Sequence, residues 1–391
     1  MITDQRSDNL GEVTNQVSGA VARGYENVRE AFAAAQAHDE GEAQLAVYRH
    51  GELVVDLWTG EENRIGIVMS CTKGLVATCA QMLVERGLLD VDEPVTRYWP
   101  EFTAKAVTVR HLLTHTAGLP SFPKEAGLVA ADALDWERCV KALGEATPAW
   151  EPGSAYAYHP LTYGYLVGEI VRRVAGRSVG EFFRTEIGEP LELDLWIGVP
   201  EEQEHRVIPQ FSTAQDFKIP AALEFGSRGV RSLVRGFTFA AECMPLLNTR
   251  EGRAAEIPAM NAVGDAHSLA RMYAATIGEV DGVRLLTEES VRQARTPQTD
   301  TVSAPSPLNL MRMPFAQRFG LGYELARPGQ PMLGSTSFGH SGAGGRLAFA
   351  DPESGLAVGY TCSNMTWDPM AGADPRWLHW TAALSGQFIA V

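Results

Sequence analysis

The stretch QLAVYRHGELVVDLW, residues 44–58, holds two short β-rich runs separated by Arg49-His50-Gly51-Glu52. Val, Leu, Tyr and Trp suit strands, and a glycine-containing turn between two such runs is typical of a β-hairpin. Farther along, residues 70–86 change to a helical period, with Gly87 as the stop. Near the C-terminus the β pattern returns and predicts four more strands, at residues 319–325, 337–342, 346–350 and 356–362.

The sequence between these two β-rich ends is mostly helical in pattern. It predicts helices at 107–115, 161–174 and 267–277, while residues 201–260 show weak periodicity and support no firm assignment. Two more helices, at 21–38 and 375–385, flank the whole. We therefore predict an α/β or α+β domain that is built from residues 1–88 and 300–391. A mainly helical domain, residues 89–299, interrupts it.

Composition excludes several classes of protein. Of 391 residues, 45% are hydrophobic and 21% charged, which is enough apolar material for one large or two ordinary domains. The net charge is −15 and no stretch concentrates Lys and Arg, so nucleic acid and anionic membranes are poor partners. No apolar run is long enough to span a membrane, and the first residues do not resemble a signal peptide. We expect a cytoplasmic protein, of undetermined oligomeric state.

The five cysteines are far apart and form no C-x-x-C pair, which favours reduced thiols over disulfides or a zinc cluster. His111 and His115 are spaced i, i+4 but lack the glutamate of an H-E-x-x-H motif, so helix packing explains them better than a metal. We therefore predict no metal site and no cofactor.

Two S-x-x-K motifs occur, at 70–73 and at 121–124, in a chain that has only five lysines. On a helix, residues i and i+3 share a face, so Ser70 and Lys73 can meet at the helix start. Pro123 interrupts the second motif, and we interpret Lys124 as a solvated lysine in a loop.

Ser70 is the stronger candidate nucleophile. Its backbone N–H lies at a helix N-terminus, where the helix dipole favours negative charge. Apolar neighbours of Lys73 would desolvate its ammonium and favour the neutral amine, which can accept the serine proton. The alternative is that Ser70 only caps the helix and that Lys73 extends toward solvent.

A third serine, Ser178, lies in the G-x-S-x-G pattern at 176–180. A nucleophile elbow needs a strand before the serine, but the pattern here places a helix before it. Ser178-Val179-Gly180-Glu181 is better interpreted as a capping box in a helix-helix turn.

Four motifs occur in a fixed order: SCTKG at 70–74, HLLTHTAGL at 111–119, WEPGSAYAY at 150–158 and GHSGAGG at 339–345. Together they resemble the serine β-lactamase and penicillin-binding-protein superfamily, in particular the class C-like branch that includes the family VIII carboxylesterases. The resemblance runs from about residue 20 to the C-terminus. It implies a β-lactamase-like fold, with an antiparallel sheet flanked by helices and a helical inserted domain.

The resemblance also implies roles for individual residues. Ser70 would be the nucleophile, Lys73 its proton partner, and Tyr158 the general base or the acid for the leaving group. The N–H groups of Ser70 and Ala343 would form the oxyanion hole. The substrate would lie along His340, Ser341 and Gly342.

Two departures from the β-lactamase pattern indicate the substrate. His340 stands where β-lactamases and transpeptidases have the lysine of Lys-Thr-Gly, so a substrate carboxylate is held less well. His159-Pro160 replaces their Ser-Asn and removes an amide that would meet a lactam or peptide group.

We therefore expect a serine carboxylesterase that acts on small neutral esters through an acyl-enzyme. The alternatives are a β-lactamase or D-alanyl peptidase, an amide hydrolase or acyltransferase, and a non-catalytic binding module. Apolar residues in or near loops that can line the pocket, or serve as ordinary packing, are Phe122, Tyr323, Met313 and Trp367.

Overall fold

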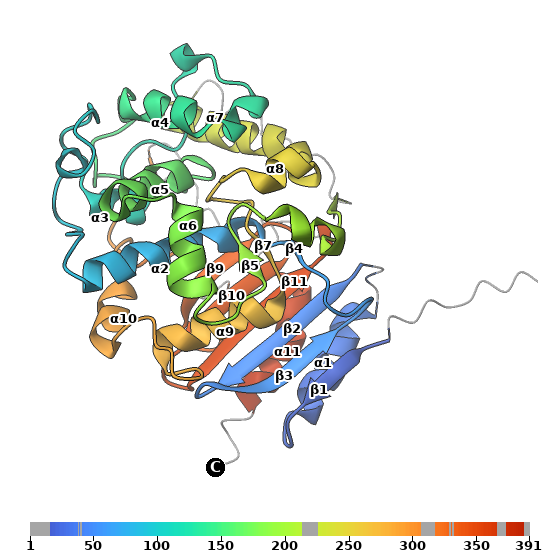
Figure 1. Ribbon diagram of the computed structural model, residues 1–391. Coiled ribbons are helices and arrows are strands. Elements are labelled where there is room, and N and C mark those ends of the chain that lie inside the picture. Colours follow the sequence, from blue (N-terminus) through green and yellow to red (C-terminus); the bar gives the residue numbers. More distant parts are fainter. Residues whose placement is uncertain are drawn as a thin grey trace, which may run out of the picture.

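The structure is a computed structural model that describes residues 16–37, 39, 41–212, 226–305, 317–327, 330, 332–365 and 373–386 (Figure 1). Its centre is a seven-stranded sheet in the order β1-β3-β2-β11-β10-β9-β8. Every neighbouring pair is antiparallel. The strands are β1 (Ser18–Val21), β2 (Ala43–Arg49), β3 (Glu52–Trp58), β8 (Glu324–Leu325), β9 (Phe338–Gly342), β10 (Arg346–Asp351) and β11 (Leu356–Cys362).

The two ends of the chain meet where β2 pairs with β11, with Val47 opposite Val358. The predicted hairpin at residues 44–58 is confirmed as β2 and β3. The antiparallel sheet built from both chain ends is confirmed as well, because β9, β10 and β11 complete it.

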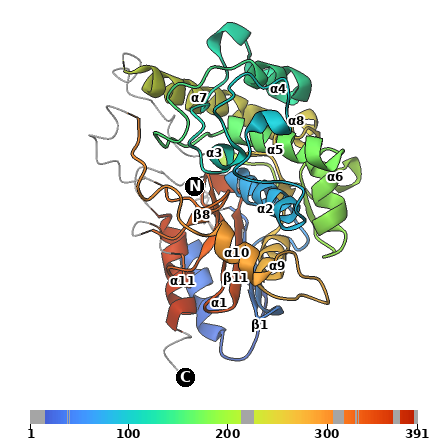
Figure 2. The same ribbon diagram turned by 90° about the vertical axis from the view of Figure 1, so that its left-hand side faces the viewer.

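Alternation along the strands gives the sheet two apolar faces. Leu45 and Val47 belong to one buried cluster, which α1 (Glu26–Gln36) and α11 (Pro375–Gly386) cover. Ala46 and Tyr48 belong to the other, which α9 (Ala266–Ile277) covers. Figure 2 shows α1 and α11 on one side of the sheet and α9 on the other.

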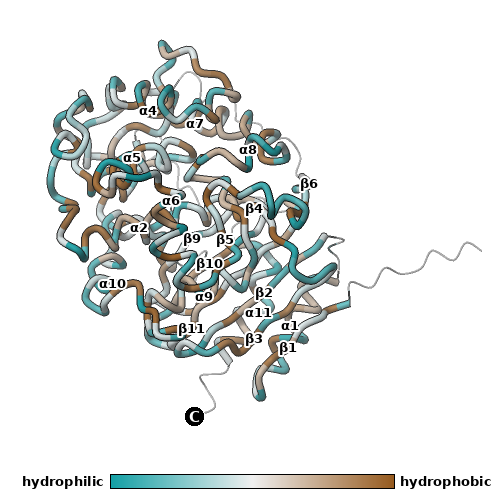
Figure 3. Tube along the Cα trace, in the orientation of Figure 1, coloured by the Kyte–Doolittle hydropathy of each residue, from teal (hydrophilic) through white to brown (hydrophobic). Residues whose placement is uncertain are grey.

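The remaining helices form a layer above the sheet in Figure 1, except α10, which lies beside α9 at the level of the sheet. They are α2 (Thr72–Glu85), α3 (Val109–Leu113), α4 (Trp136–Gly144), α5 (Thr162–Ala175), α6 (Val179–Phe183), α7 (Arg228–Cys243), α8 (Arg250–Ala254) and α10 (Glu288–Ala294). Hydrophobic and hydrophilic colours alternate along the outer helices in Figure 3, as amphipathic helices require. Short strands complete the fold: β4 (Gly66–Ile67) and β5 (Leu195–Trp196) pair with β7 (Val263–Gly264), and β6 (Phe211–Ser212) pairs with β12 (Asn364–Met365).

Two sequence predictions need correction, and one unassigned stretch gains a helix. The helix predicted at 21–38 begins only at Glu26, because residues 18–21 pair with the edge of β3. The strand predicted at 319–325 is ordered as a strand only at its last two residues. The stretch 201–260, which had no assignment, contains the 16-residue helix α7. The division of the chain into residues 1–88 with 300–391 and 89–299 stays a prediction.

Candidate active site

Ser70 lies in a 3-10 turn, Met69–Cys71, which leads directly into α2. Met69 has a left-handed backbone with φ of 52°, a rare conformation for a residue that has a Cβ. The Thr72 hydroxyl donates to Met69 O at 2.6 Å and accepts from Ala262 N–H at 3.0 Å, which fixes this backbone. Ser70 itself stays partly exposed between buried neighbours, so its hydroxyl is presented at a helix start.

Lys73 lies one turn farther along and is fully buried. Its Nζ is 3.2 Å from Ser70 Oγ, 2.8 Å from Pro160 O and 2.7 Å from Ala259 O. In the part of the chain that the structure describes, no carboxylate forms an ion pair with it. Burial therefore lowers the pKa of Lys73 well below its usual value, and the nearby Cys71 opposes this only in part.

The three contacts of Lys73 suit a neutral amine. A neutral amine has two N–H donors and one lone pair, and carbonyl oxygens can only accept. When Lys73 is neutral, as its lowered pKa favours, the carbonyls of Pro160 and Ala259 take the two N–H groups and the lone pair is left for the Ser70 hydroxyl. This geometry can remove the serine proton.

Tyr158 completes the group. Its side chain interacts with that of Ser70, which lowers the Tyr158 pKa, and Lys73 Nζ lies 4.9 Å from the centroid of its ring. The ring packs against His115 and Phe319, with centroids 4.9 and 6.2 Å away. Burial raises the pKa of Tyr158, and the interaction with Ser70 offsets this only in part. At neutral pH Tyr158 is therefore a phenol with a proton to give.

Strand β9 brings the fourth motif beside Ser70. Cys71 Sγ donates to His340 O at 3.2 Å, and a Cβ on Gly342 would lie 2.6 Å from Val68 O. Only a glycine at position 342 allows this approach. Ala343 follows directly and is partly exposed, as an oxyanion donor near Ser70 would have to be.

The imidazole of His340 is fully buried. Its Nδ1 lies 2.6 Å from Ser341 O, so Nδ1 carries the proton and Nε2 is an acceptor. Burial lowers the pKa of His340 to about 4, although Glu324 and the Ser341 carbonyl oppose this. The position thus holds a neutral ring at pH 7.

Glu324 is a residue of this site that the sequence did not reveal. It is fully buried on the edge strand β8, and its Oε2 accepts from Ser341 N–H at 2.9 Å and from Ser341 Oγ at 2.7 Å. It therefore anchors the middle of the His340-Ser341-Gly342 motif. The signal available was one acidic residue within an apolar run, at residues 319–325. The carbonyls that hold Lys73 gave no signal, because every residue has one.

Two predicted pocket residues lie in the core. Tyr323 is fully buried, its hydroxyl lies 2.9 Å from Thr78 Oγ1, and its ring packs on Phe338. Phe122 packs between Tyr165 and Phe239 in the helical layer. Since packing occupies both side chains, we leave them out of the site. Met313 and Trp367 lie outside the described residues.

Ser178 is confirmed as a helix cap. Its Oγ accepts from Glu181 N–H at 3.1 Å at the start of α6 and donates to Glu256 Oε1 at 2.5 Å. All five cysteines are free and buried. Among the described residues, no group of three or more His, Cys, Asp or Glu is placed to hold a metal, and no helix is long and apolar enough to cross a bilayer.

Known proteins resemble this chain over most of its length. The sequence model of the family described as Beta-lactamase matches residues 28–382. The protein "Esterase/beta-lactamase LipL" of Mycobacterium tuberculosis is 36% identical over 343 residues, 81% of this chain and 76% of that protein. The crystal structure of a family VIII carboxylesterase has a TM-score of 0.81 at 29% identity and covers 95% of this chain and 100% of its own. EstA from Arthrobacter nitroguajacolicus Rue61a has a TM-score of 0.81 at 30% identity, with 96% and 100% covered.

Proposed function

The chain belongs to the beta-lactamase family and is a serine esterase, and we propose that it hydrolyses small neutral carboxylic esters through an acyl-enzyme on Ser70. The observation that carries the proposal is the position of Lys73. Its amine is desolvated, its two N–H groups are taken by Pro160 O and Ala259 O, and its remaining face is 3.2 Å from Ser70 Oγ.

Acylation starts when Lys73 Nζ accepts the Ser70 proton as Oγ attacks the ester carbonyl. The carbonyl π electrons move to oxygen, and this oxyanion faces the N–H groups of Ser70 and Ala343. When the tetrahedral intermediate collapses, the C–O bond to the alcohol breaks. Tyr158 gives its phenolic proton to the departing alkoxide and recovers a proton from Lys73, which is neutral again.

Deacylation runs through the same groups in reverse. A water takes the place of the alcohol beside Tyr158 and attacks the acyl carbonyl. Its proton passes to the Tyr158 oxygen as the phenolic proton moves to Lys73 Nζ, and Lys73 then returns a proton to Ser70 Oγ. The free acid leaves, and Ser70, Lys73 and Tyr158 regain their starting protonation.

Selection of neutral esters follows from His340. A β-lactam or a D-alanyl peptide carries a carboxylate, and its recognition requires a nearby cation. Burial keeps the pKa of His340 at about 4, so this position offers no cation at pH 7. An uncharged ester has no carboxylate, so its binding does not depend on a cation at this position.

The test compares p-nitrophenyl acetate and butyrate with nitrocefin, a β-lactam that carries a carboxylate. We expect ester turnover to exceed nitrocefin turnover by at least about 10²-fold, on the order of one lost charge-assisted contact in the transition state. Nitrocefin turnover equal to ester turnover would instead favour a β-lactamase.

The nucleophile is tested with Ser70→Ala and with Ser178→Ala as the matched control. Intact mass after treatment with a fluorophosphonate should show one adduct on the wild type and on Ser178→Ala, and none on Ser70→Ala. An adduct that survives Ser70→Ala would overturn the assignment.

A further inference from the structure

The turn between β9 and β10 is held by four side chains on three successive carbonyls, and one of the four is Cys362, whose Sγ donates to Gly344 O at 3.3 Å. Arg346 Nη1 donates to Ala343 O at 3.2 Å, and Arg376 Nη2 donates to Gly344 O at 2.7 Å. Trp377 Nε1 donates to Gly345 O at 2.7 Å. This turn follows the proposed oxyanion donor, the N–H of Ala343, and two of the four donors come from the start of α11.

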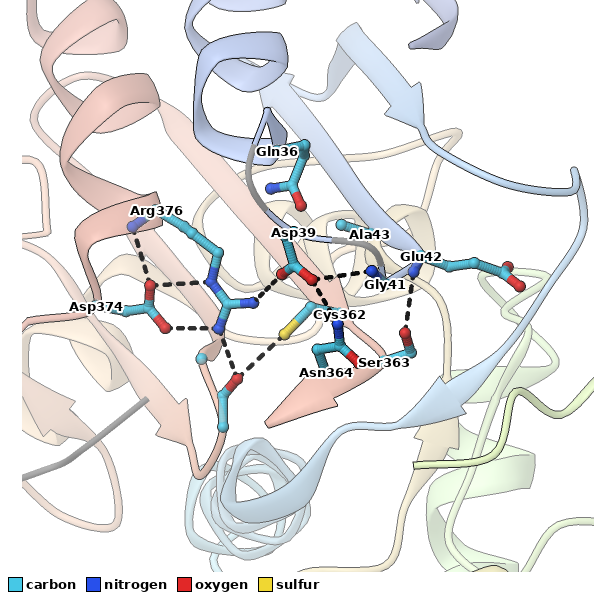
Figure 4. A network of polar contacts seen from close by, with 12 residues as sticks. Gln36, Asp39, Gly41, Glu42, Ala43, Cys362, Ser363, Asn364, Asp374 and Arg376 are labelled. Carbon is cyan, nitrogen blue, oxygen red and sulfur yellow. Dashed lines mark hydrogen bonds and ion pairs between the residues drawn. The ribbon is translucent and has the colours of Figure 1, made fainter. Parts of the chain in front are cut away.

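Arg376 is itself fixed by two carboxylates (Figure 4). Asp374 accepts from its Nε at 3.0 Å and from its Nη2 at 2.7 Å, and Asp39 accepts from its Nη1 at 2.6 Å. Asp39 also accepts from Gly41 N–H at 2.9 Å and from Asn364 Nδ2 at 2.6 Å. Arg376 is 7% exposed and Asp374 1% exposed, so these charges meet inside the protein. A buried, paired guanidinium keeps one orientation, because any rotation would leave a charge without its partner.

The turn requires such support. Gly344 and Gly345 have φ of 80° and 104°, and a Cβ on Gly345 would lie 2.1 Å from Arg376 Nη2. Glycine is needed for this backbone and this approach, yet glycine also has the widest conformational freedom. The side chains that bind the carbonyls supply the constraint that the glycines lack.

We propose that Arg376 is a positioning residue for the oxyanion hole. Through the Gly344 carbonyl it sets the direction of the Ala343 N–H, with Trp377 as its neighbour on the same turn. The start of α11 thereby stabilises the oxyanion of the reacting ester indirectly, through the turn that carries the Ala343 N–H. The inference rests on the proposed function, because it needs the Ala343 N–H to face the oxyanion.

The test uses Arg376→Lys, Arg376→Gln and Trp377→Phe, assayed with an oxygen ester and with the thiono ester of the same acid. Sulfur is a poor hydrogen-bond acceptor, so the thiono ester gains little from oxyanion donors. For the oxygen ester we expect kcat to fall about 10- to 100-fold with KM within about 3-fold, as for a donor misplaced by a fraction of an ångström. The thiono ester should lose much less, so the ratio of the two rates should fall.

Leu384→Ala is the matched control. Leu384 is fully buried on the same helix but lies outside the turn. We expect it to lower the thermal midpoint while the ratio of oxygen-ester to thiono-ester rates stays that of the wild type. A fall in this ratio equal to that of Arg376→Gln would reduce Arg376 to a helix anchor and overturn the proposal.

A milder variant and a second measurement, inhibition by a transition-state analogue, keep the test valid if the Arg376 variants fold poorly. Asp39→Asn keeps the Arg376 side chain and weakens one of its contacts, and a small alkylboronic acid mimics the tetrahedral intermediate. The inhibition constant of the boronic acid should rise in the same order as kcat falls: Asp39→Asn, then Arg376→Lys, then Arg376→Gln. An inhibition constant and a rate ratio that both stay at the wild-type level in folded variants would refute the inference. Full activity of Ser70→Ala would instead refute the proposed function itself.

Discussion

The four-residue motif S-x-x-K occurs twice in this molecule, at residues 70–73 and 121–124, in two different environments. Lys73 is fully buried and lies 3.2 Å from Ser70 Oγ at the start of a 14-residue helix. Lys124 is exposed in a three-residue 3-10 turn, and Ser121 Oγ lies 2.8 Å from Ser232 Oγ. Motif spacing is equal in the two places, so spacing does not by itself make a base.

The difference comes from what surrounds each lysine. Lys73 Nζ is hydrogen-bonded to the carbonyls of Pro160 and Ala259, which lie 87 and 186 residues farther along the sequence. These carbonyls replace water around the amine. Lys124 is exposed and keeps its hydration. A lysine becomes a proton acceptor when its amine is buried among carbonyl oxygens and has no carboxylate nearby to stabilise its charged form.

The largest difference between the two motifs should appear when the serine of each is replaced by alanine. Ser70→Ala should lower kcat/KM for p-nitrophenyl butyrate on the order of 10⁴-fold or more, because the acyl-enzyme cannot form. Ser121→Ala removes hydrogen bonds to Ser232 and Arg235 and should leave kcat/KM within about 2-fold. Equal losses in the two variants would erase the distinction between the motifs.

The two lysines give the next contrast. Lys73→Met keeps the side-chain length but removes the amine, and we expect kcat to fall about 10³-fold, while Lys124→Met is silent. In the wild type, kcat should fall toward low pH as Lys73 takes up a proton, and this fall should lie well below pH 10.5 because the pKa of Lys73 is lowered by burial. Activity that rises only as the pH approaches the ordinary lysine range would mean that Lys73 is charged at neutral pH.

A smaller loss of kcat is expected when Tyr158, which lies beside the Ser70 motif, is replaced. Tyr158→Phe keeps the ring against His115 but removes the hydroxyl, and kcat should fall about 10²- to 10³-fold. With burial raising the pKa of Tyr158, no basic limb should appear in the wild-type profile below pH 10. An ester with an activated leaving group, such as p-nitrophenol, should lose less than an alkyl ester, since p-nitrophenolate needs no proton to depart.

The smallest effect concerns stability near the second motif. Leu119 N–H donates to His159 Nε2 at 3.0 Å, two residues before Ser121, and burial lowers the pKa of His159 to about 4. The unfolded chain takes up this proton below about pH 6.5 and the folded chain only near pH 4, so stability falls as the pH drops between these values. Between pH 7 and pH 5 this residue should account for about 2 kcal/mol.

His159→Gln removes that titration. Its free energy of unfolding in urea should depend less on pH than that of the wild type, by about the same 2 kcal/mol between pH 7 and pH 5. Identical pH dependence would show that His159 is already protonated in the folded protein.

Several parts of the fold follow from local sequence. The hairpin of β2 and β3, the helix α2 and the cap at Ser178 each depend on residues within a few positions, and all are confirmed. Predictions were wrong where a distant partner decides. Residues 18–21 become a strand because the edge of β3 supplies hydrogen bonds. For Tyr323 the sequence left pocket lining and packing both open, and it lies in the core because Thr78 and Phe338 surround it.

The sequence by itself indicated which side chains are candidates for the chemistry: Ser70 and Lys73 from their motif and residue types, and Tyr158 from the resemblance to a known superfamily. Only the tertiary structure decided the state of those groups. The carbonyls of Pro160 and Ala259, the Glu324 carboxylate under Ser341 and the Arg376 guanidinium under Gly344 come from distant parts of the chain. Their effect depends on distance and desolvation, which the order of residues does not express, because both arise only when separate segments pack together.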